Sequence, residues 1–109
     1  MHDSRPFSLD LLSYQSEGRA SASLPAAGEP VLSALLIETM RRYADEILGD
    51  GGAKLVSVSL DMTGAVFAGG DIEIRCKTDR QTRTLLFIRG ELKSADALYL
   101  KAASIHRLG

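Results

Sequence analysis

Apolar residues recur along the chain with two periods, a helical one over residues 30–48 and a strand-like one in segments before and after it. In residues 30–48 the apolar positions repeat every three to four residues, as on one face of a helix. Pro30 suits the first helical position, and Gly49 supplies a left-handed exit. The stripe consists of Leu32, Leu36, Met40, Tyr43, Ala44, Ile47 and Leu48. The pattern predicts one long helix over residues 30–48, apolar over most of its circumference.

Apolar and polar residues alternate in several further segments, which is typical of half-buried strands. The predicted strands cover residues 18–24, 54–63 with a continuation through Val66 and Phe67, 71–78, 83–92 and 97–107. The paired glycines Gly69 and Gly70 predict a hairpin turn before the strand at 71–78. Residues 79–82 and 94–96 predict the next two turns, and Gly90 predicts a bulge.

The predicted order is a strand, the helix and then four strands with short connections. Short connections favour an antiparallel meander for those four strands, and the first strand adds beside one of them. The expected fold class is α+β, with one long central helix wrapped by a curved antiparallel sheet of about five strands. Residues 1–16 form an N-terminal extension, in which residues 7–14 are expected to make a short helical turn. Because the helix–sheet contact is the main core, Asp in place of Leu36 or Met40 should unfold the protein.

The composition limits the classes of protein to which the chain can belong. Its 109 residues, 45% hydrophobic and 25% charged, suit a single domain over residues 1–109. The formal charge of −1 provides no field for nucleic acid, and no apolar run approaches the ~18–20 residues of a membrane span. Without a secretion signal, the expected location is the cytoplasm. The lone Cys76 and the widely separated His2 and His106 argue against a zinc site. A domain this small gains from covering a face with a partner, so we expect a homodimer or a homotetramer made as a dimer of dimers.

Four segments together resemble the hotdog fold, in particular the small acyl-CoA thioesterases related to the phenylacetate-pathway enzyme. EGRASASL resembles the first strand of that family, and LLIET resembles a stretch of its central helix. VFAGGDIEIRCKTDRQTRT resembles the hairpin that follows, and GELKSADALYLKAASIHRL resembles the closing pair of strands. The resemblance implies hydrolysis of the thioester of an acyl-CoA or of a carrier-bound acyl group, at active sites shared across a dimer. Coenzyme A then takes part as a portion of the substrate, and no other cofactor is implied.

The resemblance places the catalytic carboxylate of the family at Glu38, with Thr39 beside it. A carboxylate poised over a thioester carbonyl can activate water or attack directly if burial raises its pKa into a useful range. The spacing of Glu38 to Arg41 and Arg42 offers a second interpretation, because residues three and four positions apart form ion pairs on a helix surface. The sequence leaves both interpretations open.

The oxyanion donor of the family departs from its usual pattern in this chain. The family usually has His-Gly-Gly nine to seven residues before the acid, and counting back from Glu38 gives Glu29, Pro30 and Val31. Pro30 has no N–H to donate. The donor is therefore expected at the backbone of Val31 or Leu32, aided by the helix N-terminus. The altered donor makes a non-catalytic hotdog module that binds acyl-CoA the alternative function.

Basic residues gather around one predicted hairpin. They are Arg75, Lys77, Arg80 and Arg83. They could seat the phosphates of CoA, or they could form a solvated edge that keeps sheets from pairing with one another. Cys76 is interpreted as a small apolar strand residue and His106 as a partly exposed strand residue, both outside the catalytic machinery. A cystatin-like fold is the alternative architecture, although its long helix usually precedes all of its strands.

Overall fold

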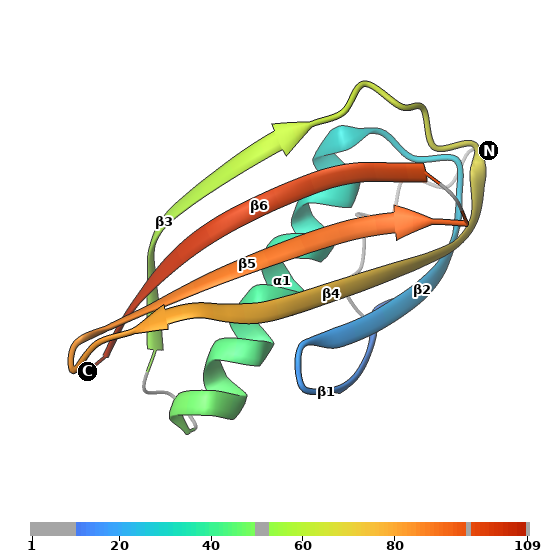
Figure 1. The fold of residues 1–109 in the computed structure, drawn as a ribbon. Helices are drawn as coiled ribbons and strands as arrows, with labels where there is room; N and C mark the ends of the chain where they lie inside the picture. Colours follow the sequence, from blue (N-terminus) through green and yellow to red (C-terminus); the bar gives the residue numbers. More distant parts are fainter. Residues whose placement is uncertain (1–10, 50–52, 96, 109) are drawn as a thin grey trace, which may run out of the picture.

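One helix and six strands make up the described part of the chain, which comprises residues 11–49, 53–95 and 97–108 of a computed structural model. The elements are β1 (Ser13–Ser16), β2 (Arg19–Pro25), α1 (Glu29–Leu48), β3 (Ala53–Met62), β4 (Gly69–Gln81), β5 (Leu85–Ser94) and β6 (Ala97–Leu108). The strands form one antiparallel sheet in the order β1-β2-β4-β5-β6-β3. The sheet curves around α1, which lies on one of its faces (Figure 1). The predicted architecture is confirmed, with one strand more than expected.

β3 lies at the far edge of the sheet beside β6, so the four strands after the helix do not form a continuous meander. The predicted hairpin at Gly69 and Gly70 is wrong, because these glycines are the first residues of β4 and pair with the end of β2. β3 ends at Met62, and the predicted continuation through Val66 and Phe67 is a loop. The reason is that β2 occupies the edge of β4 where a hairpin partner would pair. Residues 63–68 therefore carry the chain across to the other side of the sheet (Figure 1).

The turn between β4 and β5 also differs from its prediction. It lies at residues 82–84 rather than 79–82, because a bulge between Thr78 and Arg80 lets β4 continue to Gln81. Thr82 closes this turn: its N–H donates to the Leu85 carbonyl oxygen at 2.8 Å, and its Oγ1 accepts from the Leu85 N–H at 3.0 Å.

Gly90 does not mark a bulge, since it pairs regularly with Cys76 on β4 and Ala102 on β6. A Cβ atom at this position would lie 3.0 Å from Leu36 Cδ1 and 3.2 Å from Cys76 Sγ. Such distances are shorter than ordinary van der Waals contact. Glycine is therefore favoured here because α1 approaches β5 closely.

α1 buries its apolar stripe against the sheet, as the sequence pattern predicts. Leu36 and Ala44 are fully buried, and Leu32 and Met40 are nearly so. The sheet residues of this core include Ile72, Ile74, Leu86, Ile88, Leu92 and Leu100. The helix begins after Gly28, whose carbonyl oxygen accepts the Leu32 N–H at 3.2 Å, and it ends at Gly49 with φ of +89°.

The described chain begins with a 3₁₀ turn at Leu11, and β1 follows from Ser13, within the segment where a helical turn was predicted. Residues 7–10 lie outside the described residues, but Ser13 and Tyr14 belong to β1 and pair with β2. The Tyr14 hydroxyl donates to Glu46 Oε1 at 2.6 Å and accepts the Gly18 N–H at 3.0 Å. These bonds tie the β1–β2 turn to the C-terminal half of α1, and a strand conformation places Tyr14 where it can make them.

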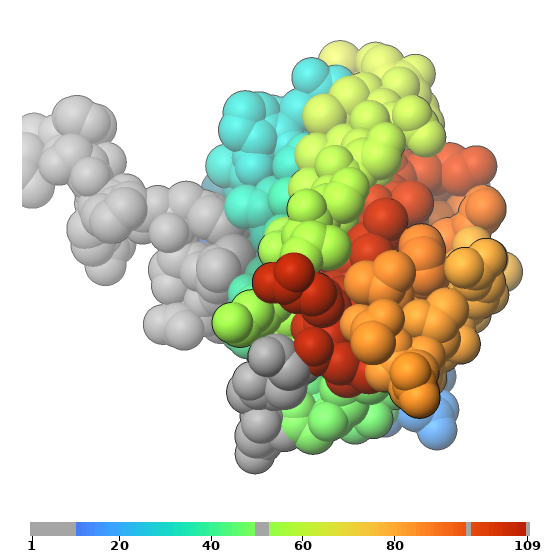
Figure 2. All heavy atoms as spheres, turned by 90° about the vertical axis from the view of Figure 1, so that its left-hand side faces the viewer, coloured from blue at the N-terminus to red at the C-terminus, as the bar shows by residue number. Residues whose placement is uncertain are grey.

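The edge strand β3 exposes apolar side chains. Leu55, Val56 and Met62 are each between 42% and 48% exposed. Figure 2 shows β3, in yellow-green, running along the surface beside the helix. One side of β3 pairs with β6, and no described strand pairs with its other side. Its outer edge is available for pairing with another chain.

Candidate functional site

Glu38 lies on the face of α1 that points away from the sheet. It is two positions from the fully buried Leu36, which places it roughly 200° further around the helix. Its side chain is nevertheless only 11% exposed, because two arginines cover it. Arg41 donates to both carboxylate oxygens at 2.7 and 2.9 Å, and Arg42 Nε donates to Oε2 at 2.7 Å. The ion pairs that the spacing indicates are therefore present.

The pKa of Glu38 is lowered, chiefly by the hydrogen bond from Arg41 and further by that from Arg42, against an opposing effect of burial. The predicted requirement for a pKa raised by burial is not met in this chain. Glu38 is thus an ionised carboxylate at neutral pH, with three guanidinium N–H groups on its oxygens. An ionised carboxylate can accept a proton from water or attack a carbonyl, although the arginines weaken its basicity.

The other predicted catalytic and oxyanion residues have distinct environments. Thr39 is fully buried, and its hydroxyl donates to the Leu35 carbonyl oxygen at 2.8 Å within the helix. The Leu32 N–H already donates to the Gly28 carbonyl oxygen, so it is not available to an oxyanion. Among the described residues, Val31 N–H has no recorded partner and lies in the first turn of α1. Val31 is consequently the backbone donor that fits the prediction better.

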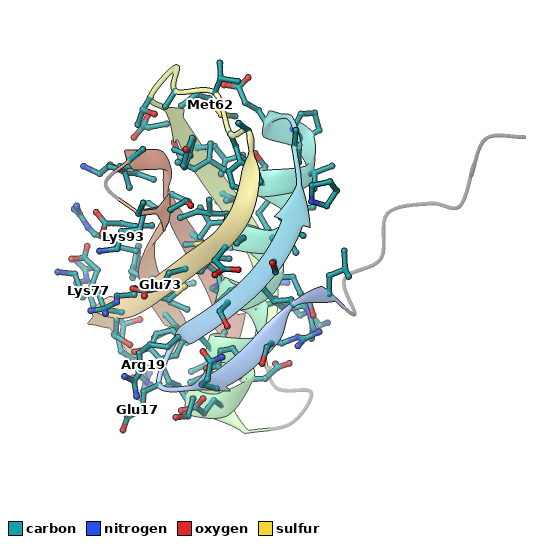
Figure 3. All side chains as sticks on the ribbon, turned by 90° about the vertical axis from the view of Figure 1, so that its right-hand side faces the viewer. Glu17, Arg19, Met62, Glu73, Lys77 and Lys93 are labelled. Atoms are coloured by element: carbon teal, nitrogen blue, oxygen red, sulfur yellow. The ribbon has the colours of Figure 1, made fainter. Side chains whose placement is uncertain are left out.

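The predicted CoA-binding residues do not form one cluster. Ile74 and Cys76 face α1, so Arg75 and Lys77 alternate onto the opposite face of the sheet, as Figure 3 shows for Lys77. Arg80 instead places its guanidinium 5.0 Å from the centre of the Phe87 ring. Arg83 is exposed in the turn between β4 and β5.

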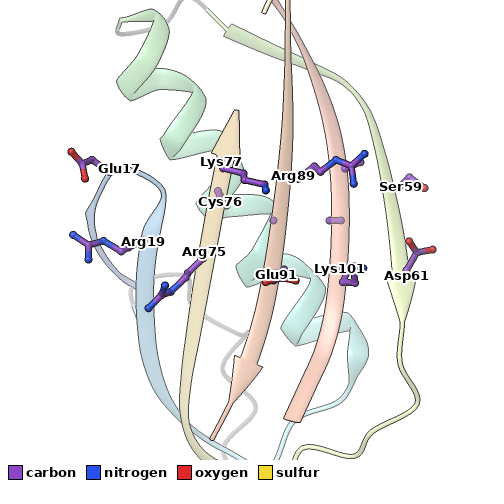
Figure 4. A pocket seen from close by; sticks show the side chains of 13 residues that line it. Glu17, Arg19, Ser59, Asp61, Arg75, Cys76, Lys77, Arg89, Glu91 and Lys101 are labelled. Atoms are coloured by element: carbon purple, nitrogen blue, oxygen red, sulfur yellow. The ribbon is translucent and has the colours of Figure 1, made fainter. Parts of the chain in front are cut away.

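The sheet therefore separates Glu38 from Arg75 and Lys77. A single ligand cannot contact both groups within one chain without passing around an edge of the sheet. Arg75 and Lys77 belong instead to a depression of about 690 Å³ on the outer face of the sheet (Figure 4). Sequence reasoning missed three further cations of this depression, Arg19, Arg89 and Lys101, which come from other strands. The register of the sheet, which the sequence does not give, is what brings them together.

Two further titratable groups are buried on the helix side of the sheet. Burial raises the pKa of the Cys76 thiol to about 12, which agrees with its interpretation as an unreactive apolar residue. His106 is only 1% exposed, so its interpretation as a partly exposed strand residue is wrong. Its Nε2 is 2.9 Å from Ser104 Oγ, and burial lowers its pKa. His106 reaches the interior because it alternates with Ser104 and Ala102 on the inward face of β6.

The described residues 11–49, 53–95 and 97–108 contain neither a metal-binding cluster nor a membrane-spanning helix. No group of three or more His, Cys, Asp or Glu side chains in these ranges is arranged to hold a metal ion. No helix in them has the length and apolar character needed to cross a membrane.

Comparison with solved structures identifies the fold. A phenylacetic acid degradation-related protein from Ralstonia eutropha JMP134 superposes with a TM-score of 0.74 at 17% identity, covering 94% of this chain and 81% of the other. A thioesterase from Haemophilus influenzae gives 0.75 at 10% identity, covering 84% and 70%. A Bacillus halodurans protein crystallised with CoA gives 0.76 at 11% identity, covering 87% and 70%. No family model and no curated protein matches the chain.

The predicted resemblance is confirmed at the level of the fold: this chain has the hotdog fold, which it shares with these three proteins. At such identities the likeness shows the architecture, and the chemistry must be argued from the residues of this chain. The cystatin-like alternative is wrong, because β1 and β2 precede the long helix.

Proposed function

We propose that this chain is a thioesterase-like protein that binds an acyl thioester, such as an acyl-CoA, with Glu38 as the reacting carboxylate. The observation that carries the proposal is an ionised carboxylate, largely shielded from water, on the outward face of the central hotdog helix. The CoA bound to the Bacillus halodurans protein and the thioesterase from Haemophilus influenzae support the choice of ligand.

The proposed reaction uses Glu38 as a general base. Water transfers a proton to the Glu38 carboxylate while its oxygen attacks the thioester carbonyl, which gives a tetrahedral oxyanion. The oxyanion then collapses, the carbon–sulfur bond breaks, and the thiol leaves with the proton returned by Glu38. The Val31 N–H, at the positive end of the helix dipole, is the proposed donor to the oxyanion.

Val31 and Glu38 indicate that two copies of the chain form each site. They lie on the same helix face but are seven residues apart, which is about 10 Å along the axis. A general base must lie within roughly 3 Å of the attacking water, and an oxyanion donor must lie within roughly 3 Å of the carbonyl oxygen of the same thioester. The two contacts are too far apart on one helix to serve one carbonyl. In this proposal Glu38 of one copy and Val31 of a second copy meet at the same thioester.

Glu38→Gln is the test of this proposal. The amide keeps the size of the side chain but cannot accept a proton, so hydrolysis of acyl-CoA, followed by release of free thiol, should fall at least 100-fold. The variant should remain folded, since Glu38 does not pack in the core. Asp45→Asn removes the other carboxylate bonded to Arg41, 3.0 Å away, and serves as the matched control with near-normal turnover. Equal turnover in Glu38→Gln and the wild type would remove Glu38 from the mechanism.

A binding module without catalysis is the second candidate, and the hydrogen bonds of Glu38 and Leu32 favour it. All three recorded hydrogen bonds to Glu38 come from arginines, and the Leu32 N–H is already used within the helix. This candidate predicts that CoA or an acyl-CoA raises the melting temperature while a panel of acyl-CoA substrates yields no thiol. Hydrolysis that depends on Glu38 would exclude it.

We expect the second copy to pair along the exposed edge of β3. The apolar Leu55, Val56 and Met62 supply surface that pairing would cover, and the outer edge supplies backbone donors and acceptors. Val56→Lys should convert a dimer into a monomer in size-exclusion chromatography with light scattering. Leu11→Lys adds the same charge at a 50% exposed leucine just before the edge strand β1, on the opposite side of the sheet, and should leave the dimer intact. A wild-type monomer at high concentration would contradict the shared site.

A further inference from the structure

The outer face of the sheet holds two pairs of like charges in direct register. Arg19 on β2 is opposite Arg75 on β4, and Lys77 on β4 is opposite Arg89 on β5. Like charges placed opposite each other on neighbouring strands destabilise a sheet. Two such pairs side by side are therefore costly to the free protein, and a bound anion would offset that cost.

These four cations and Lys101 border the depression of about 690 Å³ described above. Its floor includes the exposed Ala103 of β6, whose short side chain leaves open space on the outer face of the sheet. Figure 4 shows Lys77 extending from β4 toward β5, and Arg89 extending from β5 across β6. A volume of this size is in the range of pockets for small organic ligands.

The carboxylates of the depression only partly balance its cations. Glu17, Glu91 and Asp61 line it against five cations, and two of these cations have carboxylate partners just outside it. Arg75 pairs with Glu73 at 2.7 Å and Arg89 pairs with Asp79 at 3.3 Å. Within the described residues, Arg19, Lys77 and Lys101 have no ion pair within 4 Å.

We propose that this depression binds the phosphate groups of a small phosphorylated molecule of nucleotide size. Phosphate matches the site because arginine forks bind its oxygens in pairs, and because cations on several strands can surround an anion with more than one negative charge. The site is separate from Glu38, since the sheet lies between them. It would act as a second binding site and does not depend on the proposed thioester chemistry.

The test measures binding of pyrophosphate and of ATP by isothermal titration calorimetry at low salt. Lys77→Gln should weaken both about tenfold, because it removes a charge-assisted hydrogen bond. The same variant should melt at the same or a higher temperature without ligand, because it removes one like-charge contact. Arg83→Gln makes the same change in charge outside the depression and should alter neither quantity.

Unchanged binding in Lys77→Gln, or equal weakening in Arg83→Gln, would overturn the site, as would the absence of any phosphate binding by the wild type. Binding to vesicles of phosphatidylcholine with phosphatidylglycerol, without binding of pyrophosphate or ATP, would assign the face to a lipid surface and overturn the small-molecule proposal. Glu38→Gln should bind pyrophosphate as the wild type does, so failure of the thioester proposal leaves this test intact.

Discussion

Replacing Leu36 with Asp is expected to leave no folded protein. Leu36 is fully buried between α1 and the sheet, and it lies against the backbone of Gly90. The change removes about 1.5–3 kcal/mol of apolar burial and also places a carboxylate inside the apolar core cluster. A carboxylate buried without a partner costs several kcal/mol more, and the net stability of a domain is only about 5–15 kcal/mol.

Far-ultraviolet circular dichroism and size-exclusion chromatography would measure this loss of structure. Leu11→Asp is the matched control, because it makes the same chemical change at a side chain that is 50% exposed. We expect it to lower the free energy of unfolding by less than about 1 kcal/mol. A folded Leu36→Asp protein with native circular dichroism would contradict the assignment of the core.

Gly18→Ala is expected to destabilise the protein by about 2–4 kcal/mol, from backbone strain together with the loss of one backbone hydrogen bond. Gly18 has a φ of +79°, a conformation that alanine adopts at a cost. The new Cβ would lie only 2.4 Å from the Cys76 carbonyl oxygen, which belongs to the rigid β4 backbone. The Cys76 N–H now donates to the Gly18 carbonyl oxygen at 2.7 Å. Relief of the overlap would move the Gly18 carbonyl oxygen away and weaken this hydrogen bond.

Urea unfolding would measure this effect, and Gly64→Ala separates its two causes. Gly64 has a similar φ of +87°, but a Cβ there would have no heavy atom within 4 Å. Its substitution should show the conformational cost alone, about 1 kcal/mol. If both variants lost the same stability, the close approach to Cys76 would have no energetic consequence.

The helix could be predicted from the sequence because its signals are local. The apolar stripe, Pro30 and Gly49 all lie within or beside the element that they specify. The strands were found for the same reason, since alternation is a property of each segment. Pairing is not local: the place of β3 beside β6 depends on β2 already occupying the edge of β4, and no residue of β3 encodes that.

The candidate site shows the same difference between local and non-local signals. The contacts of Glu38 with Arg41 and Arg42 follow from helical spacing, so the sequence was sufficient to indicate them. The grouping of Arg75 and Lys77 with Arg19, Arg89 and Lys101 requires the register of four strands, so the sequence pattern joined them with Arg80 and Arg83 instead. The available signal was that these basic residues occupy the outward-facing positions of their strands. Combined with the strand order, that signal would have located the depression.

The pairing of β3 with β6 has a consequence for synthesis of the protein. The ribosome makes β3 directly after the helix, but its partner β6 emerges only after β4 and β5. Until then the nascent polypeptide carries both edges of β3 unpaired, with Leu55, Val56 and Met62 among its side chains. Such an intermediate is prone to aggregate, so a chaperone that shields this segment should raise the yield of native protein.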